Sequence, residues 1–189
     1  MTAAATLGYP RIVERLLGFG ATIDGGNALH GAACNRQLEV CRTLLARGAS
    51  MEATDGQGRI PLHYFLSVKN SEEIRFVWDY ADFGLINRAD HAGVTPFMRA
   101  AASMDAEGVR HLWENGGRTN LYDEAGMAAL HHAAKCGRLE TLELLLRSSD
   151  LGDYKSVCLN RLASLSDSKK NFASLILSLI HISEPTRPY

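Results

Sequence analysis

Hydrophobic and polar positions along this chain follow a pattern that returns about every 33 residues. Each copy opens with a compact segment such as Ala-Leu-His or Pro-Leu-His, which begins at Ala28, Pro61, Pro96 and Ala129. A second segment follows, with apolar residues at i, i+3 and i+4 as expected of an amphipathic helix. This period indicates one supersecondary unit that is copied and stacked, because a single copy cannot bury its apolar face alone.

Each unit is predicted to contain a turn, a short helix, a second turn and a longer helix. An Asp-x-x-Gly element supplies the turn, since glycine adopts positive φ without a steric cost. Thr95 and Asn27 occupy N-cap positions, and Pro61 and Pro96 suit the first residue of a helix. A pair of alanines keeps the first helix thin, so that neighbouring units can approach closely. The predicted fold class is therefore all-α.

The units align on themselves over most of the chain, and they span about 1–24, 25–52, 53–86, 87–119 and 120–150. The first unit lacks its leading turn, because Met1 and Thr2 stand where the next unit has Leu29 and His30. We therefore expect the chain to begin inside a longer array. Residues 151–176 read as two short amphipathic helices, which fits a degenerate helical terminal unit because end repeats are atypical.

The last residues do not continue the pattern. Residues 177–187 read LSLIHISEPTR, and one reverse translation of this segment resembles the adapter of transposon-based sequencing libraries. We therefore expect residues 177–189 to be a non-native tail and exclude them from the fold. The alternative is a genuine disordered tail, which Pro185 and Pro188 would also suit, and the coding DNA separates the two.

The repeated landmarks resemble those of the ankyrin repeat family, whose consensus reads D-x-x-G-x-T-P-L-H-x-A-A-x-x-G and then V-V-x-x-L-L-x-x-G-A. The resemblance covers residues 1–150 and rests on five phased copies with the Ala-Ala, Leu-Leu and Gly-Ala landmarks. It implies an all-α ankyrin-repeat solenoid of helix-turn-helix units with β-turn or hairpin connections. It also implies a non-catalytic module that recognises another protein through its turn tips and its concave helix face.

The chain departs from that consensus at two kinds of position. No unit keeps both the Thr and the His of T-P-L-H, because Thr95 is paired with Met98 while His63 and His131 lack the threonine. Loss of an N-cap costs about 1 kcal/mol, so we expect the third and fifth units to be intrinsically weak. The glycine after Ala-Ala is also replaced in three units, which disfavours a positive φ there or strains it. The three replacements are Arg36, Lys69 and Met104.

Composition narrows the function classes. Hydrophobic residues make up 46% of the chain and charged residues 22%, and the net charge of -1 gives no reason to expect nucleic acid or an acidic membrane as a partner. The chain has no apolar run long enough to span a bilayer, and Arg11, Glu14 and Arg15 interrupt any signal-peptide core. Its four cysteines match no C-x-x-C or zinc spacing. We therefore expect an intracellular monomer, cytoplasmic or nuclear.

One pair of side chains could carry chemistry. His132 and Cys136 lie at i and i+4 on one predicted helix face, which would suit half of a metal site or a nucleophile with its base. No second pair stands at ligand spacing, and His131 occupies the family's structural histidine position. We therefore predict no catalytic, cofactor-binding or metal-binding residue and no cofactor, so the chain is not expected to be an enzyme.

The resemblance also implies where a protein partner would bind. The family's contact positions flank the turn Asp, follow the turn Gly and lie just past Ala-Ala. By register these positions are Thr54, Gln57, Arg59, Ser67, His91, Val94, Ser103, Tyr122, Glu124, Met127 and Lys135. Aromatic residues, Met and Arg are enriched at interfaces, so Tyr122 and Arg59 are the expected anchors. Any single one of these positions is better explained as a solvated turn residue. Taken together, the positions give a more specific hypothesis, namely that they form a binding surface.

Two other functions stay open at this point. The missing leading turn and the foreign-looking tail would fit the targeting or regulatory segment of a larger, truncated enzyme or signalling protein of the kinase or NTPase type. Enzymatic activity within these residues is the other alternative, and it rests on His132 and Cys136 alone. The full-length coding sequence would distinguish an independent module from a segment of a larger protein.

Overall fold

The computed structural model describes residues 1–23, 27–66 and 83–147, and every regular element within these segments is helical. In chain order the elements are α1 (Thr2–Leu7), α2 (Pro10–Gly18), α3 (Ala28–Cys34), α4 (Leu38–Ala46), α5 (Pro61–Phe65), the 3-10 helix η1 (Phe83–Asn87), α7 (Pro96–Ser103), α8 (Ala106–Glu114), α9 (Ala129–Lys135) and α10 (Leu139–Leu146). The predicted all-α class is confirmed. The predicted terminal unit, 151–176, and the predicted tail, 177–189, lie outside the described residues.

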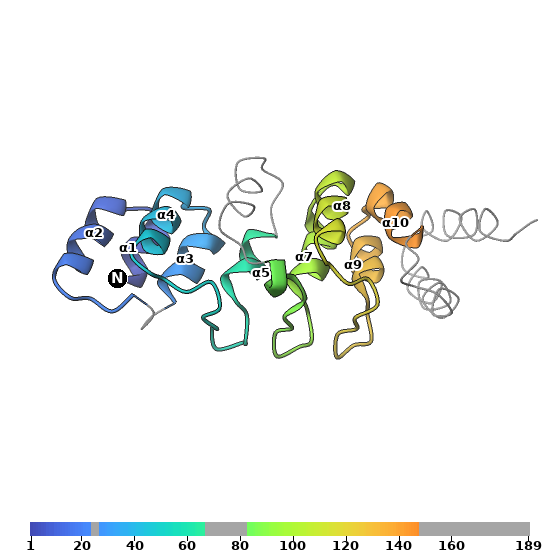
Figure 1. Ribbon diagram of the computed structural model, residues 1–189, viewed down its shortest axis with the longest axis horizontal. Coiled ribbons are helices and arrows are strands. Elements are labelled where there is room, and N and C mark those ends of the chain that lie inside the picture. Colours follow the sequence, from blue (N-terminus) through green and yellow to red (C-terminus); the bar gives the residue numbers. More distant parts are fainter. Residues whose placement is uncertain (24–26, 67–82, 148–189) are drawn as a thin grey trace, which may run out of the picture.

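The helix pairs stack side by side in a row, with α1 and α2 at one end and α9 and α10 at the other (Figure 1). The first helices contact one another along the row, α1 on α3, α3 on α5, α5 on α7 and α7 on α9. The second helices pack likewise, with α2 on α4 and α8 on α10. The turns that precede α5, α7 and α9 project together from one side of the row (Figure 1). The stack therefore presents its turns as an aligned series.

Side-chain caps start both helices of the fourth unit. The Thr95 Oγ1 atom accepts the backbone N–H of Met98 at 3.2 Å, and the Asp105 Oδ1 atom accepts that of Gly108 at 2.8 Å. The predicted Thr95 cap is confirmed. Asn27 is the N-cap residue of α3, as predicted, but its backbone is left-handed with φ 54° and its side chain makes no cap hydrogen bond. A capping side chain reaches the first turn from an extended backbone, which Asn27 lacks.

The chain leaves the first helix of a unit in two different ways. Gly137 has a positive φ of 70°, as the consensus glycine would. Arg36 keeps the same left-handed conformation with φ 60°, because its N–H still bonds the Ala33 carbonyl at 3.2 Å. Met104 instead has φ -81° and is fully buried, so the fourth unit turns without a left-handed residue. Lys69 lies outside the described residues.

One continuous core runs between the two rows of helices. Leu44, Leu112 and Leu145 occupy equivalent positions of three second helices, are fully buried and belong to one cluster. The alanine pairs of α3, α7 and α9 are buried beside them, which lets successive first helices approach closely. Leu16, the equivalent residue of α2, is only half-buried, and Val77, the equivalent residue of the third unit by register, lies outside the described residues.

Candidate functional site: a row of linked fingers

Three turns project from the row and are built in the same way. We call them the fingers, and they are Asp55–Arg59, Asp90–Val94 and Asp123–Met127 (Figure 1). In each finger the aspartate N–H donates to the carbonyl oxygen four residues on, over 3.0, 2.9 and 3.0 Å in chain order. The glycine before that carbonyl has a φ of 74°, 75° or 67°, which closes the turn. Each finger is therefore a small hairpin-like turn.

The aspartate side chain holds the finger from inside. The Asp55 Oδ1 atom accepts the backbone N–H groups of Gln57 at 2.8 Å and of Arg59 at 3.0 Å. Asp90 binds the same two positions of its own finger, both at 2.9 Å. A short turn leaves such N–H groups without main-chain partners, so the carboxylate satisfies them and fixes the shape of the tip.

Neighbouring fingers are joined by their main chains. The His91 N–H donates to the Gln57 carbonyl at 2.9 Å, and the Glu124 N–H donates to the Ala92 carbonyl at 3.0 Å. These bonds run from each finger to the one before it. The three tips therefore form one connected surface rather than three independent loops.

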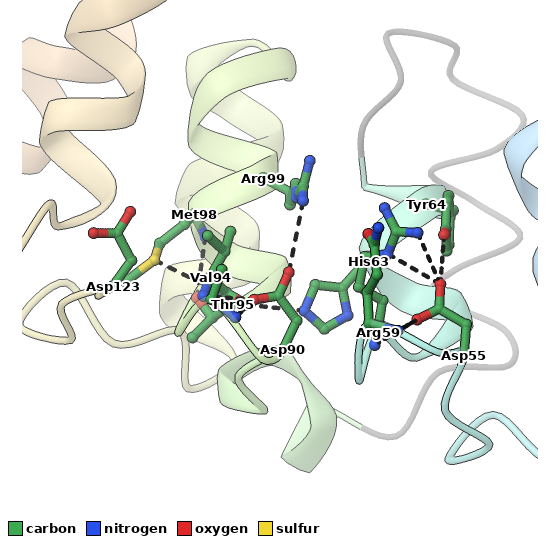
Figure 2. A network of polar contacts seen from close by, with 12 residues as sticks. Asp55, Arg59, His63, Tyr64, Asp90, Val94, Thr95, Met98, Arg99 and Asp123 are labelled. Carbon is green, nitrogen blue, oxygen red and sulfur yellow. Dashed lines mark hydrogen bonds and ion pairs between the residues drawn. The ribbon is translucent and has the colours of Figure 1, made fainter. Parts of the chain in front are cut away.

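The second carboxylate oxygen of each finger aspartate contacts a side chain nine residues further on, in the first helix of the same unit. The pairs are Asp55–Tyr64 at 2.7 Å, Asp90–Arg99 at 3.6 Å and Asp123–His132 at 2.9 Å. Figure 2 shows the first two pairs on adjacent units. They tie each finger to its helix. The sequence signal was a polar side chain directly after the Pro-Leu-His position in these three units, but its type changes each time, and sequence reasoning missed it.

The pair that could carry chemistry, His132 and Cys136, has a structural explanation in this arrangement. The His132 ring is bonded to Asp123, and the Cys136 thiol is exposed at the end of α9. Among the described residues, no three His, Cys, Asp or Glu side chains gather as metal ligands would. None of the helices in those same segments is both long and apolar enough to cross a membrane.

Of the three finger aspartates, Asp55 has the largest set of polar partners (Figure 2). Its Oδ2 atom accepts the Tyr64 hydroxyl at 2.7 Å and the Arg59 Nε–H at 3.0 Å. Burial raises the pKa of this carboxyl, but the bonds from Tyr64, from the Gln57 and Arg59 backbone and from the Arg59 guanidinium outweigh burial and hold the pKa well below 3.8. Burial and the bond to Asp55 raise the pKa of Tyr64 to about 12. At neutral pH the pair is therefore a carboxylate and a protonated phenol.

Buried histidines connect two of the first helices, α3 and α5, to the next finger. The His30 Nε2 atom lies 2.9 Å from the Arg59 carbonyl oxygen, and the His63 Nε2 atom lies 3.0 Å from that of Val94 (Figure 2). The His63 Nδ1 atom accepts the Ile60 N–H at 3.2 Å. The ring is therefore neutral and donates its Nε2–H to Val94. Burial, the largest influence, lowers the pKa of His63 below 6.5.

The residues predicted to contact a partner follow the fingers and the ends of the first helices. Six are exposed: Thr54, Gln57, His91, Tyr122, Glu124 and Lys135. Four are half-buried: Arg59, Val94, Ser103 and Met127. Ser67 lies outside the described residues.

The two predicted anchors have different surroundings. Tyr122 is 39% exposed and directly precedes the aspartate of the third finger. The Arg59 side chain is 24% exposed, its guanidinium carbon lies 4.8 Å from the centroid of the Tyr64 ring, and it is paired with Asp55 at 3.0 Å. Arg59 therefore stabilises its own finger, and Tyr122 offers the larger accessible side chain.

The fingers, the paired helices and the alanine-lined packing are those of a known repeat type. A family model described as ankyrin repeats matches the chain in three overlapping copies, over residues 1–87, 32–123 and 81–156. Ankyrin repeat protein nuc-2 of Neurospora crassa is 30% identical over 125 residues, which are 66% of this chain and 12% of nuc-2. Human Rabankyrin-5 is 31% identical over 126 residues, 65% of this chain and 10% of Rabankyrin-5.

A shorter relative covers the chain to a similar extent. The Probable 26S proteasome regulatory subunit p28 of Saccharomyces cerevisiae is 29% identical over 125 residues, 65% of this chain and 55% of p28. The chain thus spans about a tenth of nuc-2 and Rabankyrin-5 and about half of p28. The family matches take in the whole described array, and the chain belongs to the ankyrin repeat family.

Proposed function

We propose that this chain is a non-catalytic recognition module that binds another protein through its finger tips and the adjoining concave side of its first helices. Ankyrin repeats are generally protein–protein interaction modules, and the proposal adds the mode of recognition for this chain. The proposed contact residues are those predicted from their positions in the repeat, and Tyr122 is the main anchor. His91 and Gln57 extend it along the neighbouring fingers.

The observation that carries the proposal is the main-chain connection between fingers. Because the His91 and Glu124 N–H groups bond the preceding finger, the exposed tips hold fixed positions relative to one another. A surface that is ordered before binding loses little conformational entropy on association, which favours affinity. Exposed and half-buried tip residues of mixed chemistry then supply specificity.

A second candidate places the same module inside a larger enzyme or signalling protein, where it would serve targeting or regulation. The short share of nuc-2 and Rabankyrin-5 that the chain spans favours this possibility. The binding mode is the same in both cases. Activities of a whole protein would then come from residues other than these.

Binding measurements with variants test the proposed surface. Once a partner is identified by affinity capture with the full chain, Tyr122→Ala and His91→Ala are expected to weaken its binding, by about fivefold or more for an anchor residue. Their melting temperatures should stay near that of the wild type. Arg42→Ala and Arg110→Ala, at exposed positions of α4 and α8, are the matched controls and should bind normally. Normal binding by both tip variants, with loss in the controls, would place recognition on the other side of the stack.

A further inference from the structure

The Arg99 side chain on α7 is held more loosely than the other arginine that is paired with a finger aspartate. Its Nη2 atom lies 3.6 Å from the Asp90 Oδ2 atom, which is an ion pair but too long for a hydrogen bond (Figure 2). Its Nε–H group is buried and has no hydrogen-bond partner among the described residues. The Arg59 guanidinium, in contrast, approaches Asp55 at 3.0 Å through both its Nε and its Nη2 atoms. Arg99 therefore keeps donors for a further partner.

The Arg99–Asp90 pair has its positive end toward solvent. The Arg99 side chain is 40% exposed, whereas that of Asp90 is 5% exposed. The Asp90 carboxylate is held inside its finger, because its Oδ1 atom accepts the backbone N–H groups of Ala92 and Val94, both at 2.9 Å. A molecule that approaches this side of α7 therefore meets the guanidinium and not the carboxylate.

A second cation lies on the neighbouring first helix. Lys135 is exposed at the end of α9, which packs on α7, and within the described part of the chain it makes no ion pair. By register His132 stands at the position of Arg99, and Lys135 follows one helical turn later on the same side. The exposed acid of the third finger, Glu124, precedes the start of α9 and is separated from Lys135 by the length of that helix. This side of α7 and α9 therefore presents two cations.

The exposure of these two residues does not arise from the ends of the chain. α7 lies inside the row and contacts both α5 and α9 (Figure 1). Lys135 corresponds by register to Cys34 at the end of α3, and Cys34 is exposed although α3 contacts both α1 and α5. This side of the first helices is therefore open to solvent in units that have neighbours on both sides.

The spacing of the two helices suggests the form of an acidic partner. The axes of packed helices lie about 8–10 Å apart. An extended polyproline II segment rises about 3.1 Å per residue with three residues per turn, so side chains at i and i+3 share one side about 9 Å apart. Carboxylates three residues apart on such a segment would therefore match cations on neighbouring helices. Two cations do not make the basic stripe that recognises a nucleic acid or an anionic membrane.

We propose that this side of α7 and α9 binds an extended acidic segment of the partner protein, with one carboxylate on Arg99 and another, three residues away, beside Lys135. The inference rests on the proposed function, because it names the chemistry of the partner at that recognition surface. A carboxylate accepts the Nε–H and an Nη–H group of a guanidinium together, which would satisfy the unpaired Nε–H group. Only the 3.6 Å ion pair restrains the guanidinium among the described residues, so a rotation of the side chain can bring Nε to the ligand.

A synthetic peptide tests the proposal with the full 189-residue chain. The probe is a fluorescein-labelled peptide of about 12 residues with the repeat Glu-Pro-Ala, which places a glutamate at every third position. Anisotropy titration should give saturable binding that weakens as the NaCl concentration rises from about 50 to 300 mM. Arg99→Gln should weaken binding by about tenfold and Lys135→Gln by about threefold, and Arg99→Lys should recover only part of the loss because it lacks the planar fork. Arg110→Gln, at an exposed position of α8, is the matched control and should bind like the wild type.

A second peptide of the same composition, with its glutamates in one block, tests the spacing and should bind about threefold more weakly. Melting temperatures should be the same for all variants. The proposal is overturned by any of four results: no saturable binding, equal affinity for the two peptides, equal loss in Arg110→Gln, or equal binding of a labelled single-stranded oligonucleotide.

The partner captured with the full chain separates this inference from the proposed function. If Tyr122→Ala and His91→Ala weaken its binding while Arg99→Gln and Lys135→Gln do not, recognition through the fingers stands and the acidic segment is wrong. If all four variants bind the partner normally, the proposed function fails as well.

Discussion

Gly93 lies directly against the backbone of Asp123 in the next finger, so close that a Cβ atom on Gly93 would be 2.9 Å from the Asp123 Cα. Gly93 also has a φ of 75°, which disfavours any L side chain. We expect Gly93→Ala to lower the free energy of unfolding by about 2–5 kcal/mol, because it combines backbone strain with a clash that the neighbouring main chain cannot relieve. Urea denaturation followed by circular dichroism measures the loss.

Two other glycines distinguish the effect of backbone strain from the effect of the steric clash. Gly116 has a φ of 104°, but a Cβ atom added there would meet no other atom within 4 Å, so Gly116→Ala should cost only the strain, about 1–2 kcal/mol. Gly56 has neither the close contact nor a positive φ, and Gly56→Ala should be nearly neutral. If Gly93→Ala cost no more than Gly116→Ala, the contact between the second and third fingers would be looser than the structure has it.

Leu112 tests the register of the core. It is fully buried at the position shared with Leu44 and Leu145, so Leu112→Ala should lower the free energy of unfolding by about 2–5 kcal/mol through lost burial and the cavity that remains. Thermal and urea denaturation measure the change. Leu7→Ala is the matched control, because Leu7 is 63% exposed and its loss should be nearly neutral. A change below about half a kcal/mol at Leu112 would mean that the helix faces are assigned wrongly.

Arg36 offers a stabilising substitution. Its backbone has a φ of 60°, a conformation that costs a non-glycine residue about 1–2 kcal/mol. Arg36→Gly should therefore raise the free energy of unfolding by about 1 kcal/mol, somewhat less than the relieved strain because glycine also gains freedom in the unfolded chain. The equivalent change Met104→Gly should destabilise, since Met104 is buried with φ -81°. Differential scanning calorimetry measures the change in melting temperature of each variant. Changes of the same sign in the two variants would contradict this prediction.

The repeat architecture was predictable because it depends on residues whose size and spacing carry the information. Alanine pairs and leucines at fixed intervals report buried contacts, and Leu44, Leu112 and Leu145 are all fully buried as expected. Backbone conformation was less predictable from residue type. Arg36 adopts the glycine conformation and Met104 does not, since the bonds at each helix end decide the outcome. Local preference was therefore overridden by the geometry of the unit.

The polar network of the fingers was not predictable, because chemically different side chains make the equivalent contact in each unit. Tyr64, Arg99 and His132 each contact the finger aspartate of their own unit. Ile60 likewise has no capping oxygen, and the His63 N–H, which such an oxygen would accept, bonds the Ile60 carbonyl at 3.0 Å instead. The intrinsic weakness of the third and fifth units stays a prediction, and this bond shows how part of the missing cap is replaced.

His63 should make the stability of the array depend on pH. Burial lowers its folded pKa below 6.5, and its Nδ1 atom must stay unprotonated to accept the Ile60 N–H. Above pH 6.5 the ring is neutral in both the folded and the unfolded chain, so it adds no pH dependence there. As the pH falls below 6.5, the unfolded chain takes up a proton that the folded chain resists. The free energy of unfolding should then decline until the pH reaches the folded pKa.

His63→Gln isolates this contribution from those of the other histidines. The variant should be less stable than the wild type at neutral pH, by about 1–3 kcal/mol for a disrupted pair of buried hydrogen bonds. Its stability should fall less steeply than that of the wild type between about pH 6.5 and 5, because the titrating ring is gone. His111→Gln, at an exposed position on α8, is the matched control and should keep most of the wild-type slope. Urea denaturation at a series of pH values gives the three slopes. A His63→Gln slope equal to that of the wild type would mean that the ring accepts a proton in the folded state, and that the bond to Ile60 does not hold it neutral.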